Sequence, residues 1–273
     1  MTPENLLESD ESVSVVIPYS PEHTPERYLD EAIESVDSQS VPTEVIVIKD
    51  EECRGPAWCR NRGLDQAETR FVAFLDADDI WKDNKLSRQL NRVSETDAGI
   101  CVEGPRGMSK DRFYKELLIG SLRSLTPTIL LDTDKVNARF EEDIERFEDH
   151  IFMIESAAEA GICFCPDLVE IRKHNGGLTS RGSPKMRTRS RVRVAEIIEE
   201  RIPEAQKYLN EFLLKTYYAE GRRLQMEKKY REAIPYLLKA LQSQIHYKPL
   251  AVLGLSVAGI LYHPVKNMLR SVE

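Results

Sequence analysis

The chain has 273 residues, of which 41% are hydrophobic, and this is enough for one large α/β domain and a smaller appendage. Its formal net charge is -8 and its pI is near 5.4. Such a chain has no net basic field to offset phosphate repulsion, so we expect no nucleic-acid partner.

The cysteines and the N-terminus indicate the cellular compartment of the protein. The five cysteines are odd in number, lack Cys-x-x-Cys spacing and lie in or beside apolar runs, a pattern typical of packed, reduced thiols. Residues 1–10 are acidic and show no basic-then-apolar leader, and no stretch reaches the ~18 apolar residues of a clear transmembrane helix. We expect a cytoplasmic protein, and peripheral attachment to the cytoplasmic face of the cell membrane stays open.

A βαβ unit is predicted to follow a flexible N-terminus, residues 1–11. Residues 12–19 form an apolar run that predicts a strand, and residues 25–38 carry apolar side chains at helical spacing. Residues 44–50 form a second β-branched run that ends in an acid. The two strands of such a unit are parallel, so their carboxyl ends lie at one edge of the sheet.

Basic residues lie between the second and third predicted strands. Gly55 and Pro56 mark a turn, and residues 57–67 can form a short helix that carries Arg60 near its start. The arginines of this segment either form a solvated face or face an anionic ligand.

Three carboxylates follow the third predicted strand. Residues 71–75 are apolar and read as a buried strand, and Asp76, Asp78 and Asp79 come directly after it. Carboxylates at the carboxyl edge of a parallel sheet are well placed to hold a divalent cation. The alternative is that they cap the following helix, but three clustered acids repel one another without a cation.

The remainder of the first domain, predicted over residues 12–185, mixes helices and strands. After residue 93 the pattern is irregular, and an acidic segment leads into a helix that ends at Gly161. The basic, glycine-containing stretch 175–193 has the composition of a mobile loop. The other predicted elements are helices at 83–93, 113–122 and 151–160, and strands at 126–131, 162–166 and 168–172.

The C-terminal extension, residues 186–273, is predicted to be helical. Residues 213–241 resemble one helix-turn-helix unit of the tetratricopeptide type, which must pack on the main domain or on a partner. Residues 250–262 are mostly apolar and short for a membrane span. A buried helix and a membrane-surface contact are both compatible with them.

Motifs spread over the first two thirds of the chain resemble, in order, those of the family 2 glycosyltransferases of the GT-A fold. The resemblance implies a mostly parallel sheet flanked by helices, with the helical extension added. The motifs are residues 15–18, residues 29–40, the Arg-Asn-Arg-Gly segment within 55–63, residues 74–79, Glu148-Asp149 before the helix that ends at Gly161, and residues 172–174.

The resemblance also implies an activity and site residues. Such enzymes are metal-dependent, inverting transferases that move a sugar from a nucleotide-diphosphate donor, commonly a UDP-sugar, to an acceptor hydroxyl. Asp149 would be the general base, Asp78 would bind Mg²⁺ or Mn²⁺ at the diphosphate, and His174 would be a further metal ligand or an ordinary loop residue. The donor would contact Pro18, Tyr19 and Asp50 at the base, Arg60 at the nucleotide and Asp76 at the ribose.

The chemistry is consistent with these roles, because a cation stabilises a diphosphate leaving group and one carboxylate takes the acceptor proton. We expect a glycan or lipid-linked acceptor, such as a cell-surface glycan precursor. The alternative function is a non-catalytic GT-A-like scaffold that recruits partners. The alternative for Glu148-Asp149 is an acid pair at a helix start. Family members often carry Asp-Asp-Gly-Ser where this chain has Lys-Asp-Glu-Glu at 49–52, which affects the base pocket.

Overall fold

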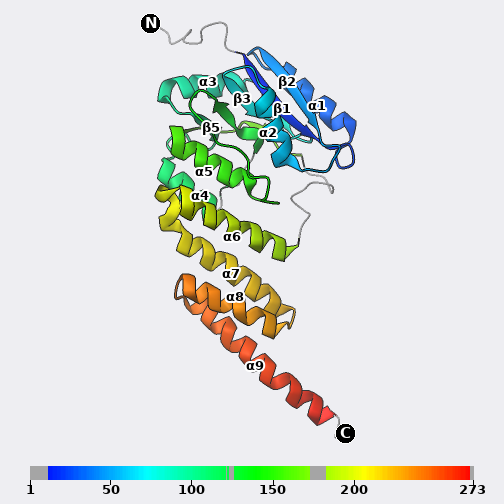
Figure 1. Cartoon of the computed structure of the whole chain (residues 1–273), viewed down its shortest axis with the longest axis vertical. Coiled ribbons are helices and arrows are strands. Elements are labelled where there is room, and N and C mark those ends of the chain that lie inside the picture. The colour runs from blue at the N-terminus through cyan, green and yellow to red at the C-terminus, as the bar shows by residue number, and fades with distance from the viewer. Residues whose placement is uncertain (1–11, 121, 123–125, 173–182, 271–273) are drawn as a thin grey trace. The chain divides into compact units, whose positions relative to one another are not determined.

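A computed structural model describes residues 12–120, 122, 126–172 and 183–270, with the backbone alone for 261–270 (Figure 1). The chain divides into two compact units. The first comprises residues 1–117 and 121–181, and the second comprises residues 118–120 and 182–273.

The first unit is built on a six-stranded sheet in the order β2-β1-β3-β6-β5-β7. β1 is parallel to β2 and β3, and β5 is parallel to β7, while β6 is antiparallel to both of its neighbours. The carboxyl ends of β1, β2 and β3 therefore share one edge. The strands are β1 (Val13–Tyr19), β2 (Thr43–Lys49), β3 (Phe71–Phe74), β5 (Ile100–Glu103), β6 (Leu130–Asp132) and β7 (Ile162–Cys165).

Helices flank this sheet (Figure 1), and β4 (Ile80–Trp81) and β8 (Val169–Glu170) form a second, two-stranded antiparallel sheet. The core is formed by the valine and isoleucine side chains of β1 and the apolar side chains of β3, which are at most 3% exposed, and by the apolar face of α1. The helices are α1 (Glu26–Asp37), α2 (Pro56–Gln66), α3 (Lys85–Thr96), α4 (Lys110–Leu118) and α5 (Glu148–Ala160).

The approach of α2 to β1 requires a glycine. A Cβ built on Gly63 would lie 2.2 Å from a methyl group of Val16, well inside van der Waals contact. Gly63 therefore lets α2 lie directly on β1. The same helix carries Arg60, so this contact sets the height of Arg60 above the sheet.

Three local predictions were wrong. The region after residue 93 was predicted to be irregular, but it contains β5, whose four residues are too short to show a period. Thr126–Thr128 is a 3-10 helix, and only Leu130–Asp132 of that run forms a strand. The basic stretch predicted as a loop is helical from Pro184, because the Ser183 hydroxyl accepts a hydrogen bond from the Met186 N–H at 3.1 Å and caps that helix.

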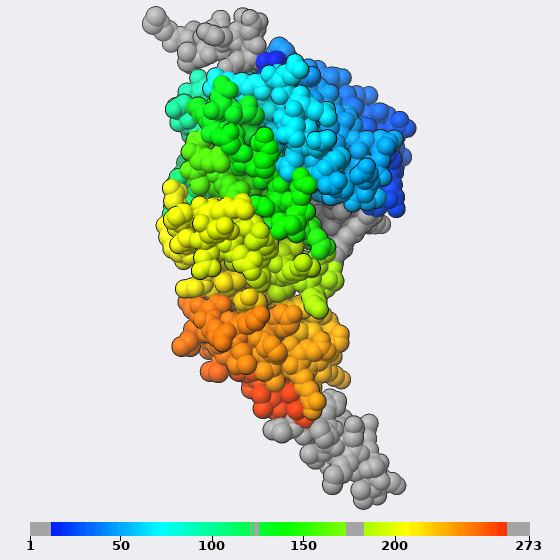
Figure 2. All heavy atoms as spheres, viewed as in Figure 1, coloured from blue at the N-terminus to red at the C-terminus, as the bar shows by residue number. Residues whose placement is uncertain are grey.

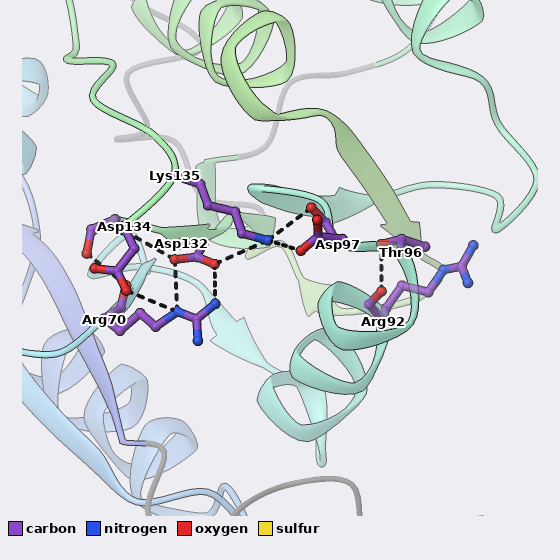
Figure 3. A network of polar contacts seen from close by, with 8 residues as sticks. Arg70, Arg92, Thr96, Asp97, Asp132, Asp134 and Lys135 are labelled. Atoms are coloured by element: carbon purple, nitrogen blue, oxygen red, sulfur yellow. Dashed lines mark hydrogen bonds and ion pairs between the residues drawn. The ribbon is translucent and has the colours of Figure 1, made fainter.

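A polar network fixes the edge of the sheet where β3 begins (Figure 3). Arg70 donates two hydrogen bonds, of 2.7 and 3.1 Å, to the fully buried carboxylate of Asp132 at the end of β6. Lys135 lies 3.9 Å from Asp132 and pairs with Asp97. These charges hold antiparallel β6 beside β3, at the edge opposite to the Asp76 carboxylate.

The described part of the second unit is helical. α7 and α8 form a hairpin. A Cβ built on Gly221 of α7 would lie 2.8 Å from the side chain of Leu237 on α8, so the two helices are in close contact there. No helix in the described ranges is long and apolar enough to cross a membrane. The elements are α6 (Pro184–Arg201), a 3-10 helix (Pro203–Tyr208), α7 (Leu209–Met226), α8 (Tyr230–Ser243) and α9 (Tyr247–Arg270).

Candidate active site

Arg60 connects three of the motifs found in the sequence. It projects from α2, is 4% exposed, and lies between two carboxylates. One terminal nitrogen donates to Asp76 Oδ1 at 2.7 Å, and the other donates to Glu148 Oε1 at 3.0 Å. The acid cluster after β3 and the acid pair at the start of α5 therefore meet at one buried guanidinium.

The charges of this cluster are coupled. Burial alone would lower the pKa of Arg60, but the carboxylates of Asp76 and Glu148 outweigh that effect and raise the pKa above the usual guanidinium value. Burial, followed by the nearby Asp149 charge, raises the pKa of Glu148, and Arg60 opposes this rise. Burial also raises the pKa of Asp76, and Arg60 favours the ionised form of both carboxylates against this effect.

The three acids after β3 have different surroundings. Asp76 pairs with Arg60, whereas Asp79 is 7% exposed and accepts a hydrogen bond from the Arg172 N–H at 3.0 Å. Burial, with the Asp76 charge second, raises the pKa of Asp79 to about 8. The next helix, α3, begins at Lys85 with Asn84 before it, so the alternative that these acids cap that helix is wrong.

Asp78, like Asp76, is less deeply buried than Asp79. Its side chain is partly exposed, and its backbone carbonyl accepts a hydrogen bond from Arg172 Nε at 3.2 Å. Among the described residues, no group of three or more histidine, cysteine or carboxylate side chains is arranged to hold a metal ion. His174 lies outside the described residues.

Asp149 stands beside the Arg60 cluster in the first turn of α5. Its side chain is 15% exposed, and its Oδ1 accepts a hydrogen bond from the His150 N–H at 2.9 Å. His150 Nδ1 lies 3.1 Å from the same oxygen. Both Glu148 and Asp149 are at a helix N-terminus, where the helix dipole favours negative charge, as the acid-pair alternative expects.

The residues predicted to contact the base lie together at the ends of two neighbouring strands. Pro18 and Tyr19 end β1, and the Asp50 N–H, just after β2, donates to the Tyr19 carbonyl at 2.8 Å. The Asp50 carboxylate accepts hydrogen bonds from the N–H groups of Arg54 at 2.7 Å and Gly55 at 2.9 Å. Asp50 therefore also shapes the turn that leads into α2.

Two residues for which the sequence predicted no role connect distant segments of this site. The Asn61 amide donates to the carbonyl of Phe140 and accepts from its N–H, both at 2.9 Å, which fixes the segment before α5 to α2. The Arg172 guanidinium lies 4.2 Å from the centre of the Tyr28 ring and pairs with Glu31, so it links β8 to α1. The periodicity of a single sequence does not predict contacts between residues that are so far apart along the chain.

Comparison with known proteins relates this chain to one family. The profile of the family described as "Glycosyl transferase family 2" matches residues 41–159, which include α2, β3, the acid cluster and most of α5. Residues 41–159 of this chain are thus similar to a family 2 glycosyltransferase domain. The matched region thus holds Arg60, Asp76, Asp78 and Asp149.

Curated relatives resemble parts of the glycosyltransferase domain. The chain is 31% identical over 140 residues to the putative teichuronic acid biosynthesis glycosyltransferase TuaG of Bacillus subtilis, covering 42% of this chain and 54% of that protein. It is 45% identical over 47 residues to an Escherichia coli protein named UDP-Glc:alpha-D-GlcNAc-diphosphoundecaprenol beta-1,3-glucosyltransferase WfaP, covering 17% of this chain and 19% of WfaP. The matches thus span about half, or less, of these relatives.

Solved structures share the fold. TarS residues 1–349 of S. aureus, in complex with UDP-GlcNAc, aligns with a TM-score of 0.63 at 21% identity, over 96% of this chain and 92% of that chain. The mannosyltransferase PcManGT of Pyrobaculum calidifontis, in complex with GDP-Man and Mn²⁺, aligns with a TM-score of 0.52 at 18% identity, over 94% of this chain and 82% of that chain. The predicted GT-A architecture, a mostly parallel sheet flanked by helices with a C-terminal helical region, is confirmed.

Proposed function

We propose that this protein transfers a sugar from a UDP-sugar to a hydroxyl group of a cell-surface glycan precursor, with inversion at the anomeric carbon. The observation that carries the proposal is the buried Arg60, which joins the donor-side Asp76 to the acid pair at the start of α5. The names of TuaG and WfaP and the UDP-GlcNAc complex of TarS support a sugar donor carrying UDP and a glycan or lipid-linked acceptor.

The donor lies, in this proposal, along the carboxyl edge of β1, β2 and β3. The base contacts Pro18, Tyr19 and Asp50, which share the ends of neighbouring strands. Asp76 accepts hydrogen bonds from the ribose, and Arg60 holds its carboxylate in a fixed orientation.

Asp78 is the residue that we propose as a ligand of Mg²⁺ or Mn²⁺. It fits this role because it is a partly exposed carboxylate beside Asp76, and oxygen donors suit both cations. His174 is a second proposed ligand. A bound divalent cation supplies charge neutralisation for a diphosphate leaving group.

Asp149 is the proposed general base. This role is the one that the family resemblance implies for Asp149, and its neighbour Glu148 accepts a hydrogen bond from Arg60. As the acceptor oxygen forms its bond to the anomeric carbon, the bond from that carbon to the diphosphate oxygen breaks, and the acceptor proton moves to an Asp149 carboxylate oxygen. His150 contacts Oδ1 of Asp149 and orients the carboxylate.

A donor-hydrolysis assay tests this proposal. We expect the protein to release UDP slowly from UDP-GlcNAc or UDP-glucose with Mn²⁺ present, and to lose this activity with EDTA or in Asp78→Asn. Asp65→Asn is the matched control, because Asp65 is an exposed acid on α2 whose nearest cation is 3.9 Å away. A folded wild-type protein that releases no UDP from any UDP-sugar would contradict the proposal and favour the scaffold alternative.

A further inference from the structure

Helix α9 leaves a wide apolar arc uncovered. Val252 and Ser256 are buried on the face that packs against the preceding helices of the same unit. On the opposite side, Leu250 is 59% exposed, Leu255 56% and Val257 44%. Figure 2 shows atoms of α9 at the surface beside α8.

The exposed positions are contiguous around the helix. At 100° per residue, the exposed residues between Tyr247 and Ala258 other than Lys248 cover an arc of about 160°. No charged side chain falls within this arc. We call it the α9 apolar face, and its members are Tyr247, Leu250, Ala251, Gly254, Leu255, Val257 and Ala258.

This face differs from ordinary exposed apolar residues. Single exposed leucines or valines are normal on soluble proteins, but a contiguous apolar surface marks a contact site. In the rest of the second unit, the described large apolar residues with high exposure are Met226 at 68%, Leu238 at 46% and Ile245 at 89%. Ile245 lies two residues before the start of α9.

The segment that carries the α9 apolar face has a positive formal charge. Residues 245–270 contain no aspartate or glutamate, although the chain as a whole has a net charge of -8. The same segment contains Lys248, Lys266 and Arg270. Lys248 is exposed and, at 100° per residue, lies next to the Leu255 edge of the face.

We propose that α9 lies on an anionic membrane surface, with its apolar face at the acyl boundary and Lys248 among the lipid phosphates. Helices that bind membranes in this way combine an apolar face with basic residues at its border, and anionic lipids add attraction for each nearby lysine or arginine. A second copy of this chain is a poorer occupant. In an isologous contact the same segment of the second copy offers no carboxylate to pair with Lys248.

This proposal does not rest on the transferase function. It goes beyond it by assigning a membrane-binding surface to the second unit, whereas the candidate active site belongs to the first. Vesicle binding is measured without any sugar donor, so a failure of donor hydrolysis and a failure of membrane binding are separate results.

The test is flotation of the full-length protein with two kinds of vesicle, one of phosphatidylcholine alone and one also containing phosphatidylglycerol. We expect the protein to float with the anionic vesicles and to be released as salt is raised. Leu250→Glu with Leu255→Glu should lower the partition coefficient about tenfold or more, because each inserted leucine contributes apolar burial. Lys248→Glu should reduce the preference for anionic vesicles.

Met226→Glu is the matched control, because it replaces an exposed apolar side chain of the same unit outside α9 and should leave flotation unchanged. All substituted side chains are exposed, and circular dichroism checks that each variant is folded. Equal flotation of the double variant and the wild type would overturn the proposal, as would no wild-type flotation with either vesicle. A wild-type dimer that becomes a monomer in the double variant, without vesicle binding, would assign the face to a second copy instead.

Discussion

Replacing Arg60 with methionine should destabilise the first unit and make its stability depend on pH. Methionine fills a similar volume but removes the cation that lies 2.7 Å from Asp76 and 3.0 Å from Glu148. Removing one partner of a buried ion pair costs about 3–5 kcal/mol, because the remaining charge is left without compensation. Here two carboxylates lose the same partner, so we expect the upper part of that range.

The pH dependence follows from the carboxylates. Burial already raises the pKa of Glu148, and Arg60 is the cation that opposes this rise. Without Arg60 the folded-state pKa lies further above the unfolded value of about 4.3, so the folded state binds more protons than the unfolded state. The stability of Arg60→Met should therefore fall as pH rises above about 4, and its loss relative to wild type should be larger at pH 8 than at pH 5.

Urea denaturation at pH 5 and pH 8 measures both effects. Arg62→Met is the matched control on α2, because Arg62 is 57% exposed and lies 3.9 Å from Asp65. We expect its stability to change by less than about 1 kcal/mol at either pH. Adding Glu148→Gln to Arg60→Met should restore part of the loss. A loss below about 1 kcal/mol for Arg60→Met, equal at both pH values, would refute the reasoning.

Three further substitutions test single contacts. Burial lowers the pKa of the unexposed Lys85 to about 7. Between pH 7 and about 10 the unfolded state therefore binds more protons than the folded state, and the wild type gains stability as pH rises. Lys85→Met should raise the free energy of unfolding at pH 7, and urea titrations should show that this gain becomes smaller toward pH 10. Burial raises the pKa of Asp79 to about 8, so Asp79→Asn, which still accepts the Arg172 N–H, should cost less than about 1 kcal/mol at pH 7 by thermal denaturation. Gly63→Ala should cost about 1–3 kcal/mol, and adding Val16→Ala should recover part of it; no loss in the single variant would contradict the close contact of α2 and β1.

The sequence predicted the parts of the fold that have a strong local pattern. β1, β2 and β3 are β-branched or aromatic runs bounded by turns, and α1 has a clear apolar face, so their positions agree to within about two residues. β5 contains only three consecutive apolar residues and β6 has three residues in all, whereas β3 lies in a run of five apolar residues. The place of β5 and β6 in the sheet comes from pairing between strands that are distant in sequence.

In the candidate site, too, local motifs were predicted and long-range contacts were not. The sequence singled out Arg60, the acids after β3 and the pair at 148–149, each because of its own motif. That Arg60 bridges Asp76 and Glu148, 16 and 88 positions away, is a property of the packing of α2 and α5 around the sheet edge. The division of the acid cluster between Arg60 and Arg172 likewise depends on where β8 lies, which no local pattern reports.

The most direct test of the proposed function is a calorimetric titration of UDP into the protein with Mn²⁺ and with EDTA. We predict that UDP binds with Mn²⁺, that GDP binds more weakly, and that Asp78→Asn loses metal-dependent binding while Asp149→Asn retains it. Absence of binding by any nucleoside diphosphate, or UDP binding that is the same with EDTA and in Asp78→Asn, would contradict the assignment of the β3 edge as the donor site.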